Sequence, residues 1–174
     1  SVRELILRKE VSITTGSNAL KEKLIDQKEA CYEVVVLPMG VDSECFKSYV
    51  EIGNRSGSEP DISLTKILYV GRLTEKKGVS YLVQAIPAVK KIYPEIHLTI
   101  VGSGELEAEL KEETISLSLE KNITFQGAVP NHKLPDYYAS HSIFVGPSIE
   151  SKGGDTEGFG LTFVEAAMAG CLLI

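Results

Sequence analysis

The chain lacks a long hydrophobic run, a paired-cysteine motif and a strongly basic segment, and each absence argues against a class of protein. No apolar stretch approaches the roughly 18 residues that a membrane-spanning helix needs. The 3 cysteines form no C-x-x-C pair, and their odd number favours a reducing compartment over a disulfide framework. Because the net charge is −6, duplex nucleic acid is not expected to be the main partner. No secretory signal peptide is visible.

The composition is that of an ordinary globular domain. The chain has 174 residues, of which 43% are hydrophobic and 24% are charged, enough for one domain or for one domain plus a fragment. The last four residues, 171–174, read as a buried strand, and a natural domain seldom ends inside a core strand. We therefore expect the chain to be a piece of a longer protein.

From residue 66 onward, short apolar strands alternate with amphipathic helices. The strands are expected at 66–70, 96–101, 122–125, 143–145 and 171–174. The helices are expected at 78–93, with a kink at Pro87, and at 105–117, 132–139 and 161–169. This alternation predicts an α/β fold in which right-handed βαβ units build a Rossmann-like parallel sheet. Because the strands are apolar throughout, helices should cover both faces of the sheet.

The segment before residue 66 divides into a structured part and a linker. Strands are expected at 11–15 and 33–37, with a helix between them that Ser17 or Asn18 caps and that ends near residue 26. The polar stretch 43–63 contains glycine and proline and reads as a linker or long loop. The predicted organisation is an end of one domain over 1–42, a linker over 43–63 and a second, incomplete domain over 64–174.

Ligands of open parallel sheets bind beyond the carboxyl ends of the strands, which points to the loops 71–77, 102–104, 126–131 and 146–160. In the first loop, Arg72 can grip phosphate oxygens with two hydrogen bonds, and Lys77 adds a second positive charge at a helix start. The alternative is a solvated charged loop. In the second loop, Gly102 and Gly104 form half of a dinucleotide fingerprint, and both a tight turn and a ligand contact remain open.

The most informative segment runs from Glu157 to Glu165. These carboxylates are eight residues apart and flank a glycine-rich turn that leads into the helix expected at 161–169. Free N–H groups at a helix start favour an anion, while a carboxylate just before it can accept hydrogen bonds from sugar hydroxyls. A nucleotide sugar offers both groups. Glu165 lies among apolar neighbours and needs a partner, which a ribose diol, Arg72 or Lys77 would supply, unless it is a surface carboxylate.

The histidines do not indicate a metal site. His97, His132 and His141 have no cysteine, aspartate or histidine at metal-ligand spacing, so His97 and His141 are interpreted as structural, and His132 lies near the ligand edge without a clear partner. No Ser-His-Asp arrangement can be argued either.

Several of these motifs occur together, in an order and spacing that resemble the retaining GT-B glycosyltransferases of the large group 1 family, also called family 4. The resemblance covers residues 66–174, and the segment from Pro38 to Phe46 looks like the connection between the two domains of that family. The matching motifs are Gly71-Arg72-Leu73…Lys77-Gly78, Val101-Gly102-Ser103-Gly104, Phe125-Gln126-Gly127, Pro147-Ser148 and Glu157-Gly158-Phe159-Gly160…Glu165-Ala166.

The resemblance implies a role for each matching residue. Arg72 and Lys77 would bind the donor diphosphate and stabilise the leaving nucleotide, Glu157 would contact the transferred sugar, and Glu165 would hold the ribose. The loop from Gln126 to Pro130 would lie near the base. The remaining residues of the implied binding set are Gly71, Gly102, Gly104, Gly127, Val129, Gly158, Phe159, Gly160 and Leu161. The family's reaction uses no metal and no cofactor, in keeping with the absence of a D-x-D-type signature.

By this resemblance the chain would carry the donor site of an enzyme that moves a hexose from a nucleotide-diphosphate sugar, with retention, to a sugar or lipid-linked acceptor. The acceptor would bind a missing N-terminal domain. Polysaccharide assembly in the cytoplasm, with room for peripheral membrane contact of the full-length protein, is the expected setting. A non-catalytic nucleotide-binding module is the alternative. A dinucleotide-dependent oxidoreductase is disfavoured by the broken glycine fingerprint and by the lack of an acidic residue closing the second strand.

Overall fold

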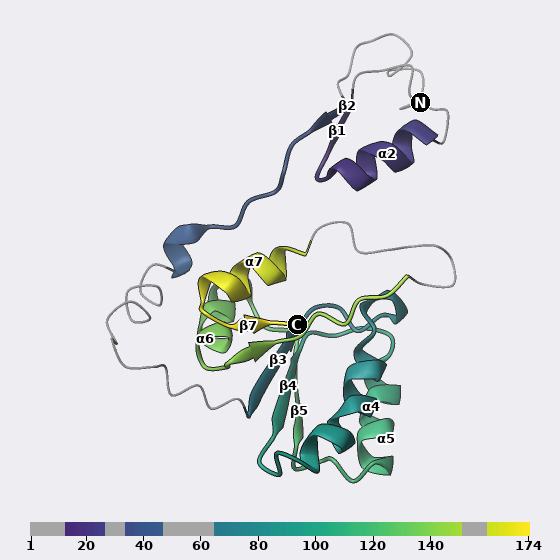
Figure 1. The fold of residues 1–174 in the computed structure, drawn as a ribbon, viewed down its shortest axis with the longest axis vertical. Coiled ribbons are helices and arrows are strands. Elements are labelled where there is room, and N and C mark those ends of the chain that lie inside the picture. Colours follow the sequence, from purple (N-terminus) through teal and green to yellow (C-terminus); the bar gives the residue numbers. More distant parts are fainter. Residues whose placement is uncertain (1–12, 27–33, 47–64, 151–159) are drawn as a thin grey trace. The chain divides into compact units, whose positions relative to one another are not determined.

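The computed structural model describes residues 13–26, 34–46, 65–150 and 160–174 (Figure 1). These residues form two compact units. One contains 13–26, 34–40 and 160–161, and the other contains 41–46, 65–150 and 162–174. The domain boundaries expected after residues 42 and 63 stay predictions.

The first unit contains a βαβ arrangement. Strand β1 (Ile13–Thr15), helix α2 (Asn18–Asp26) and strand β2 (Val34–Val36) follow one another, and the strands pair in parallel with Ile13 opposite Val34. The Ser17 hydroxyl oxygen accepts a hydrogen bond of 3.3 Å from the Leu20 amide. Ser17 therefore caps α2, which confirms one of the two capping residues that the sequence predicts.

The second unit is built on a five-stranded parallel sheet in the order β5-β4-β3-β6-β7. Four α-helices and three short 3₁₀ helices connect and cover its strands. The strands are β3 (Lys66–Val70), β4 (His97–Val101), β5 (Ile123–Gly127), β6 (Ile143–Phe144) and β7 (Leu172–Leu173). The described helices are η1 (Ser43–Phe46), η2 (Glu75–Lys77), α4 (Val79–Lys90), α5 (Glu107–Ser116), η3 (Asn131–Lys133), α6 (Leu134–Ala139) and α7 (Leu161–Met168), of which only Leu161 is grouped with the first unit. The α/β fold predicted from the sequence is confirmed.

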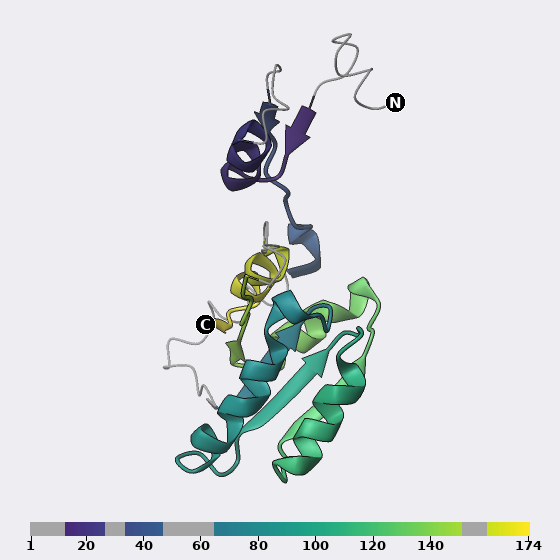
Figure 2. The ribbon, with the colours of Figure 1, turned by 90° about the vertical axis from the view of Figure 1, so that its right-hand side faces the viewer.

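Both faces of the sheet are buried around β3, β4 and β6, which explains why these strands are apolar throughout. The expected buried strand at 171–174 is wrong for most of its length: Cys171 is buried, but Leu172, Leu173 and Ile174 are exposed, because β7 is an edge strand. Successive residues of a strand point to opposite faces. In β3, Ile67 and Tyr69 face the core cluster that α4 and α5 cover. Leu68 faces the second cluster, to which α6 and α7 contribute, and Val70 packs against that cluster. Figures 1 and 2 show the pair α4 and α5 side by side on one face of the sheet.

Helix α4 follows its predicted apolar stripe but ends earlier than expected. Val79, Leu82, Val83 and Ile86 are buried, as the helical spacing predicts. The helix continues through Pro87 and stops at Lys90, whereas the sequence pattern extends it to residue 93. Residue 94 is a proline, which disfavours helical backbone at the residue before it and accounts for the earlier end.

His141 ties α6 to β4. Its Nδ1 lies 2.7 Å from the Tyr137 carbonyl oxygen and its Nε2 lies 2.8 Å from the Thr99 hydroxyl. A carbonyl only accepts, so Nδ1 carries the hydrogen and the Thr99 hydroxyl donates to Nε2. Burial lowers the pKa of His141, which keeps the ring neutral. The structural interpretation of His141 is therefore confirmed. Among the described helices, none is both long and apolar enough to cross a membrane.

Candidate functional site

The order of the strands locates the place where a ligand would bind. The chain passes from β3 to β4 and β5, and then returns to β6 on the other side of β3. In open α/β sheets, ligands bind beyond the carboxyl ends of the strands at such a reversal, because the following loops diverge there. The loops concerned are 71–78 after β3 and 145–150 after β6. Arg72 and Lys77 lie in the first of them.

The loops after β3 and β4 are bonded backbone to backbone. The Gly71 amide donates to the Val101 carbonyl at 3.0 Å, and the Leu73 amide donates to the Ser103 carbonyl at 3.0 Å. A Cβ added to Gly102 would overlap the carbonyl oxygen of Gly71, and one added to Gly104 would overlap that of Leu73. Close packing of the two loops thus explains why glycines occupy positions 102 and 104 of this turn. A contact of Gly102 and Gly104 with a ligand stays a prediction.

The loop after β6 is equally close to the loop after β3. The Ile149 amide donates a hydrogen bond of 2.8 Å to the Lys76 carbonyl. Gly78 has a φ of 62°, and a Cβ on it would overlap the carbonyl oxygen of Pro147. The segment that carries Arg72 and Lys77 is therefore held from both sides, by the loops of its two neighbouring strands.

A buried tyrosine of β3 is hydrogen-bonded to the segment that carries Arg72 and Lys77. Tyr69 is 2% exposed, and its hydroxyl donates a hydrogen bond of 2.8 Å to the carbonyl oxygen of Arg72. Burial raises the pKa of Tyr69, so the phenol stays protonated and remains a donor. We did not single out Tyr69 from the sequence, where it reads only as one more apolar strand residue.

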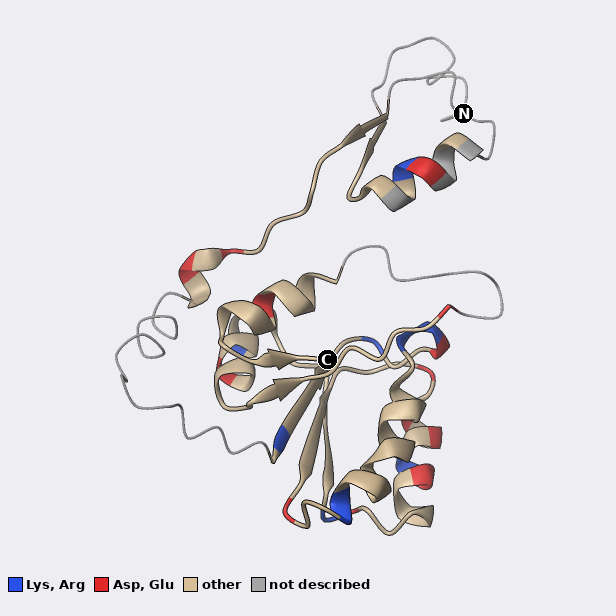
Figure 3. Ribbon diagram, in the orientation of Figure 1, with Lys and Arg blue, Asp and Glu red and all other residues tan. Residues whose placement is uncertain are grey.

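The segment carries the cations Arg72, Lys76 and Lys77 together with one carboxylate, Glu75. Figure 3 shows blue and red side by side there. Burial lowers the pKa of the half-buried Lys77 ammonium, and repulsion from Lys76 and Arg72 lowers it further. Arg72 is exposed. The buried hydroxyl oxygen of Thr74 has no hydrogen-bond partner among the described residues. A bound anion would relieve the repulsion between the cations, as expected for the predicted diphosphate contact.

Glu165 has a partner that the sequence did not indicate. Its Oε2 accepts a hydrogen bond of 2.6 Å from the hydroxyl of Tyr138. The sequence suggested a ribose diol, Arg72 or Lys77 as the partner of this half-buried carboxylate. A tyrosine among the apolar residues of the helix predicted at 132–139 was the available signal, but the contact spans 27 residues and has no local signature.

The other predicted residues are placed as far as the description reaches. Gly127 ends β5, and its carbonyl accepts a hydrogen bond of 2.8 Å from the Gly102 amide. Val129 packs against the core cluster that contains Tyr138. Leu161 is the first residue of α7 and Gly160 precedes it, in line with the predicted helix start. The remaining predicted residues, Glu157, Gly158 and Phe159, lie outside the described residues.

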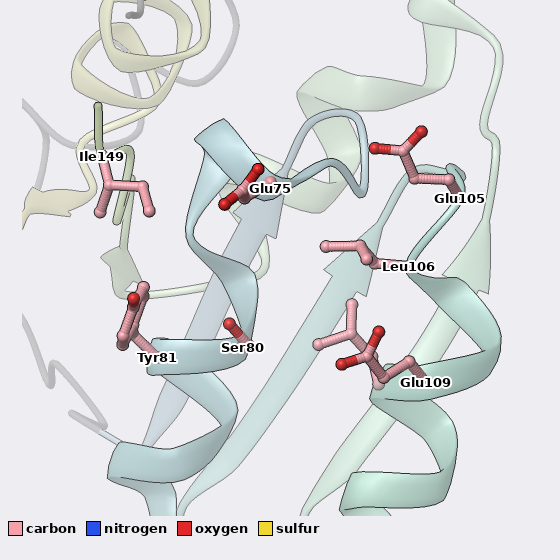
Figure 4. Close-up of a pocket in the computed structure, with 8 residues that line it drawn as sticks. Glu75, Ser80, Tyr81, Glu105, Leu106, Glu109 and Ile149 are labelled. Atoms are coloured by element: carbon pink, nitrogen blue, oxygen red, sulfur yellow. The ribbon is translucent and has the colours of Figure 1, made fainter. Parts of the chain in front are cut away.

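A hollow of about 510 Å³ lies beside η2 and the first turns of α4 and α5 (Figure 4). Glu75, Glu105 and Glu109 line it, together with Ser80 and Tyr81. Because these carboxylates would repel phosphate groups, this hollow does not fit a donor diphosphate. Over the residues that the structure describes, no three histidine, cysteine, aspartate or glutamate side chains gather as a metal site.

Comparison with protein families identifies one match. The sequence model of the family described as "Glycosyl transferases group 1" matches residues 55–174, more than half of the chain. The matched residues include all five strands of the sheet β5-β4-β3-β6-β7.

Curated relatives and a solved structure agree with it. The chain is 35% identical over 154 residues, which is 88% of its own length, to the amylovoran biosynthesis glycosyltransferase AmsK of Erwinia amylovora. It is 30% identical over 145 residues, 79% of its length, to a GDP-mannose-dependent alpha-(1-6)-phosphatidylinositol monomannoside mannosyltransferase of Mycobacterium tuberculosis. The chain spans 36% of each of these relatives. The structure of HepE from Anabaena in complex with UDP and glucose shares the fold, with a TM-score of 0.71 at 19% identity, over 93% of this chain and 43% of that one.

Gly78 offers a direct test of the packing between the loops after β3 and β6. We expect Gly78→Ala to lower the free energy of unfolding by about 2–4 kcal/mol, because it adds an overlap with Pro147 to the strain of a left-handed residue. Gly170 is the matched control. Its φ is 85°, yet nothing lies within 4 Å of an added Cβ. Gly170→Ala should therefore cost only about 1–2 kcal/mol. Urea unfolding of both variants measures the difference, and equal losses would contradict the packing argument.

Proposed function

The chain belongs to the group 1 glycosyl transferases, and we propose that it carries the donor-binding part of a retaining enzyme of the family 4 type. The proposed reaction moves a hexose from a nucleotide-diphosphate sugar to an acceptor. The observation that supports the proposal is that Arg72 and Lys77 lie near each other in one loop, which backbone hydrogen bonds hold at the reversal point of the sheet.

Two fixed cations suit the chemical demand of this reaction. When the bond between the sugar and the diphosphate breaks, negative charge builds up on the departing nucleotide. Charges that are already in place stabilise that change without reorganisation. Arg72 can form two parallel hydrogen bonds to phosphate oxygens, and Lys77 adds a compact charge. We propose that these residues serve instead of a metal ion.

The other roles follow the family pattern residue by residue. Glu157 would contact hydroxyls of the transferred sugar, and Glu165 would hold the ribose. Backbone N–H groups at the start of α7 would face the sugar or the phosphate, from Gly158, Phe159, Gly160 and Leu161. The turn with Gly127 and Val129 would lie near the base, while Gly71, Gly102 and Gly104 would let the backbone approach the donor.

Two similar proteins indicate the class of sugar donor. One relative is GDP-mannose-dependent, and one solved neighbour holds UDP and glucose. These proteins support our proposal that the donor is a nucleoside diphosphate, with guanine or uracil as the base, that carries a hexose. Another relative is a glycosyltransferase of amylovoran biosynthesis. We propose that this chain serves polysaccharide assembly. We propose a cytoplasmic protein whose acceptor, a sugar or a lipid-linked sugar, binds a separate domain with peripheral access to the membrane.

The first experiment is calorimetric titration of the chain with UDP, GDP and ADP. We expect at least one of them to bind, and we expect Arg72→Ala and Lys77→Ala each to weaken that binding about 10- to 100-fold, since each removes a charge-assisted hydrogen bond. Lys121→Ala is the matched control, because Lys121 precedes β5 and thus lies at the opposite, amino-end edge of the sheet. It should bind like the unaltered chain.

The outcomes of this titration separate the candidate functions. Absence of binding by all three nucleotides, or equal binding by the unaltered chain and both alanine variants, would refute the site. Tighter binding of NAD than of any nucleoside diphosphate would favour an oxidoreductase instead.

The lowered pKa of Lys77 gives a second prediction. A protonated Lys77 attracts the diphosphate, so the affinity for the nucleotide should be highest near neutral pH. It should fall as the pH rises through the pKa of Lys77, which is below that of an ordinary lysine. We expect a loss of about tenfold between pH 7 and pH 10. Lys77→Arg keeps its charge over this range and should lose far less. Both proteins see the same titration of the nucleobase, so only the difference between their profiles reports Lys77.

Glu157 distinguishes an enzyme from a binding module. In a protein that joins this chain to an acceptor-side domain, Glu157→Ala should retain nucleotide affinity but lose transfer by about 100-fold or more, because it would remove a contact to the sugar alone. Turnover with a panel of nucleotide sugars, compared with nucleotide binding by the same variant, checks this expectation. A variant that transfers sugar normally would contradict the role of Glu157.

A further inference from the structure

The contact between Tyr138 and Glu165 is not explained by the roles proposed so far. The Tyr138 hydroxyl donates to Oε2 of Glu165 over 2.6 Å, which lies in the range of strong, charge-assisted O–H···O⁻ hydrogen bonds. Tyr138 is on α6 and Glu165 is on α7, so the bond joins two helices that cover the same face of the sheet.

The packing of Tyr138 allows its ring little freedom. The residue is 0% exposed. Its ring lies between two other aromatic rings, with centroid distances of 6.2 Å to Phe46 and 5.9 Å to Phe144. Its carbonyl oxygen also accepts a hydrogen bond of 3.2 Å from the Cys171 thiol, which follows α7 in the chain. The hydroxyl is therefore presented to α7 from a fixed position.

In this pair Tyr138 is the hydrogen-bond donor and Glu165 is the acceptor. Burial raises the pKa of the Tyr138 phenol far above its usual range, and the hydrogen bond to Glu165 raises it further, so the phenol donates at any physiological pH. A carboxylate accepts only, but it offers two oxygens and about four lone-pair positions. The contact to Tyr138 uses Oε2, which leaves acceptor positions for a diol.

We propose that the Tyr138 hydroxyl positions the Glu165 carboxylate to accept hydrogen bonds from both hydroxyls of a ribose. This inference rests on the proposed function, in which Glu165 holds the ribose of the donor. A glutamate has three rotatable side-chain bonds, and fixing one carboxylate oxygen before the ligand arrives removes most of the ordering that binding would otherwise require. Tyr138 would thus be a positioning residue that acts through Glu165 and does not touch the donor.

A purely structural role for the same contact makes a different prediction. A buried tyrosine hydroxyl needs a hydrogen-bond partner wherever it lies. If satisfying that hydroxyl were the whole purpose of the contact, its loss would change stability and would leave the recognition of ribose unaltered. The two explanations are therefore separated by the selectivity of binding for nucleotides with ribose over nucleotides with 2′,3′-dideoxyribose.

The test compares UDP, GDP and ADP with their 2′,3′-dideoxy forms, using calorimetric titration of the whole chain. Tyr138→Phe retains the ring and removes only the hydroxyl. We expect it to weaken binding of the ribose nucleotide about 5- to 20-fold and to leave binding of the dideoxy nucleotide unchanged, so that selectivity for ribose falls by the same factor.

Three further variants make the result specific. Tyr137→Phe is the matched control, since Tyr137 is the preceding residue of α6 and packs against the same cluster. It should leave selectivity unchanged. Glu165→Ala should abolish selectivity. Replacement of Tyr138 by 4-aminophenylalanine restores a hydrogen-bond donor at the same ring position and should retain most of the selectivity, whether or not the phenylalanine variant folds. Circular dichroism on heating shows which variants are folded.

The outcomes distinguish this inference from the donor site itself. If no nucleotide binds the unaltered chain, the proposed function fails, and the inference fails with it. If the chain selects ribose through Glu165 but folded Tyr138→Phe selects it equally well, only the role of Tyr138 is refuted. Equal weakening of ribose and dideoxy nucleotides by Tyr138→Phe, or loss of selectivity in the 4-aminophenylalanine variant, also overturns it.

Discussion

Backbone contact between neighbouring loops is the constraint on which the candidate site depends. The loop after β3 lies against the loop after β4 at Gly102 and Gly104, and its end at Gly78 lies against the loop after β6. Side chains at these positions would hold the loops apart. With glycines there, amide and carbonyl groups meet directly, and the segment carrying Arg72 and Lys77 has one backbone path. The backbone positions from which Arg72 and Lys77 extend are thereby fixed.

The segment gathers several positive charges. Lys77 is half-buried, and its ammonium is opposed by Lys76 and Arg72, which is why its pKa is lowered. These cations lie in the loop at the reversal of the sheet, and Glu75 of the same loop lines the neighbouring hollow with Glu105 and Glu109. The proposed diphosphate would compensate the charges of these cations.

The sequence was informative wherever local pattern controls structure. Apolar strands and helical periodicity predicted the parallel sheet and most of its elements. One of the two residues predicted to cap α2, Ser17, does so. It failed where distant pairing or a neighbouring residue decides. Strand β5 was expected to end at residue 125 but extends to Gly127, because Gly127 pairs with Val101 across an irregularity in the register. The contacts of Tyr69 and Tyr138 were also missed, since a tyrosine in an apolar segment does not reveal where its hydroxyl points.

These two tyrosines play parallel parts in the architecture. Tyr69 belongs to the core cluster under α4 and α5, and its hydroxyl reaches the backbone of Arg72. Tyr138 belongs to the cluster on the opposite face, and its hydroxyl reaches the carboxylate of Glu165. In each case a buried ring, fixed by packing, carries one polar atom from the core to a proposed ligand-binding residue. The cationic and the anionic half of the proposed site are thus each tied by one hydrogen bond to the core on a different face of the same sheet.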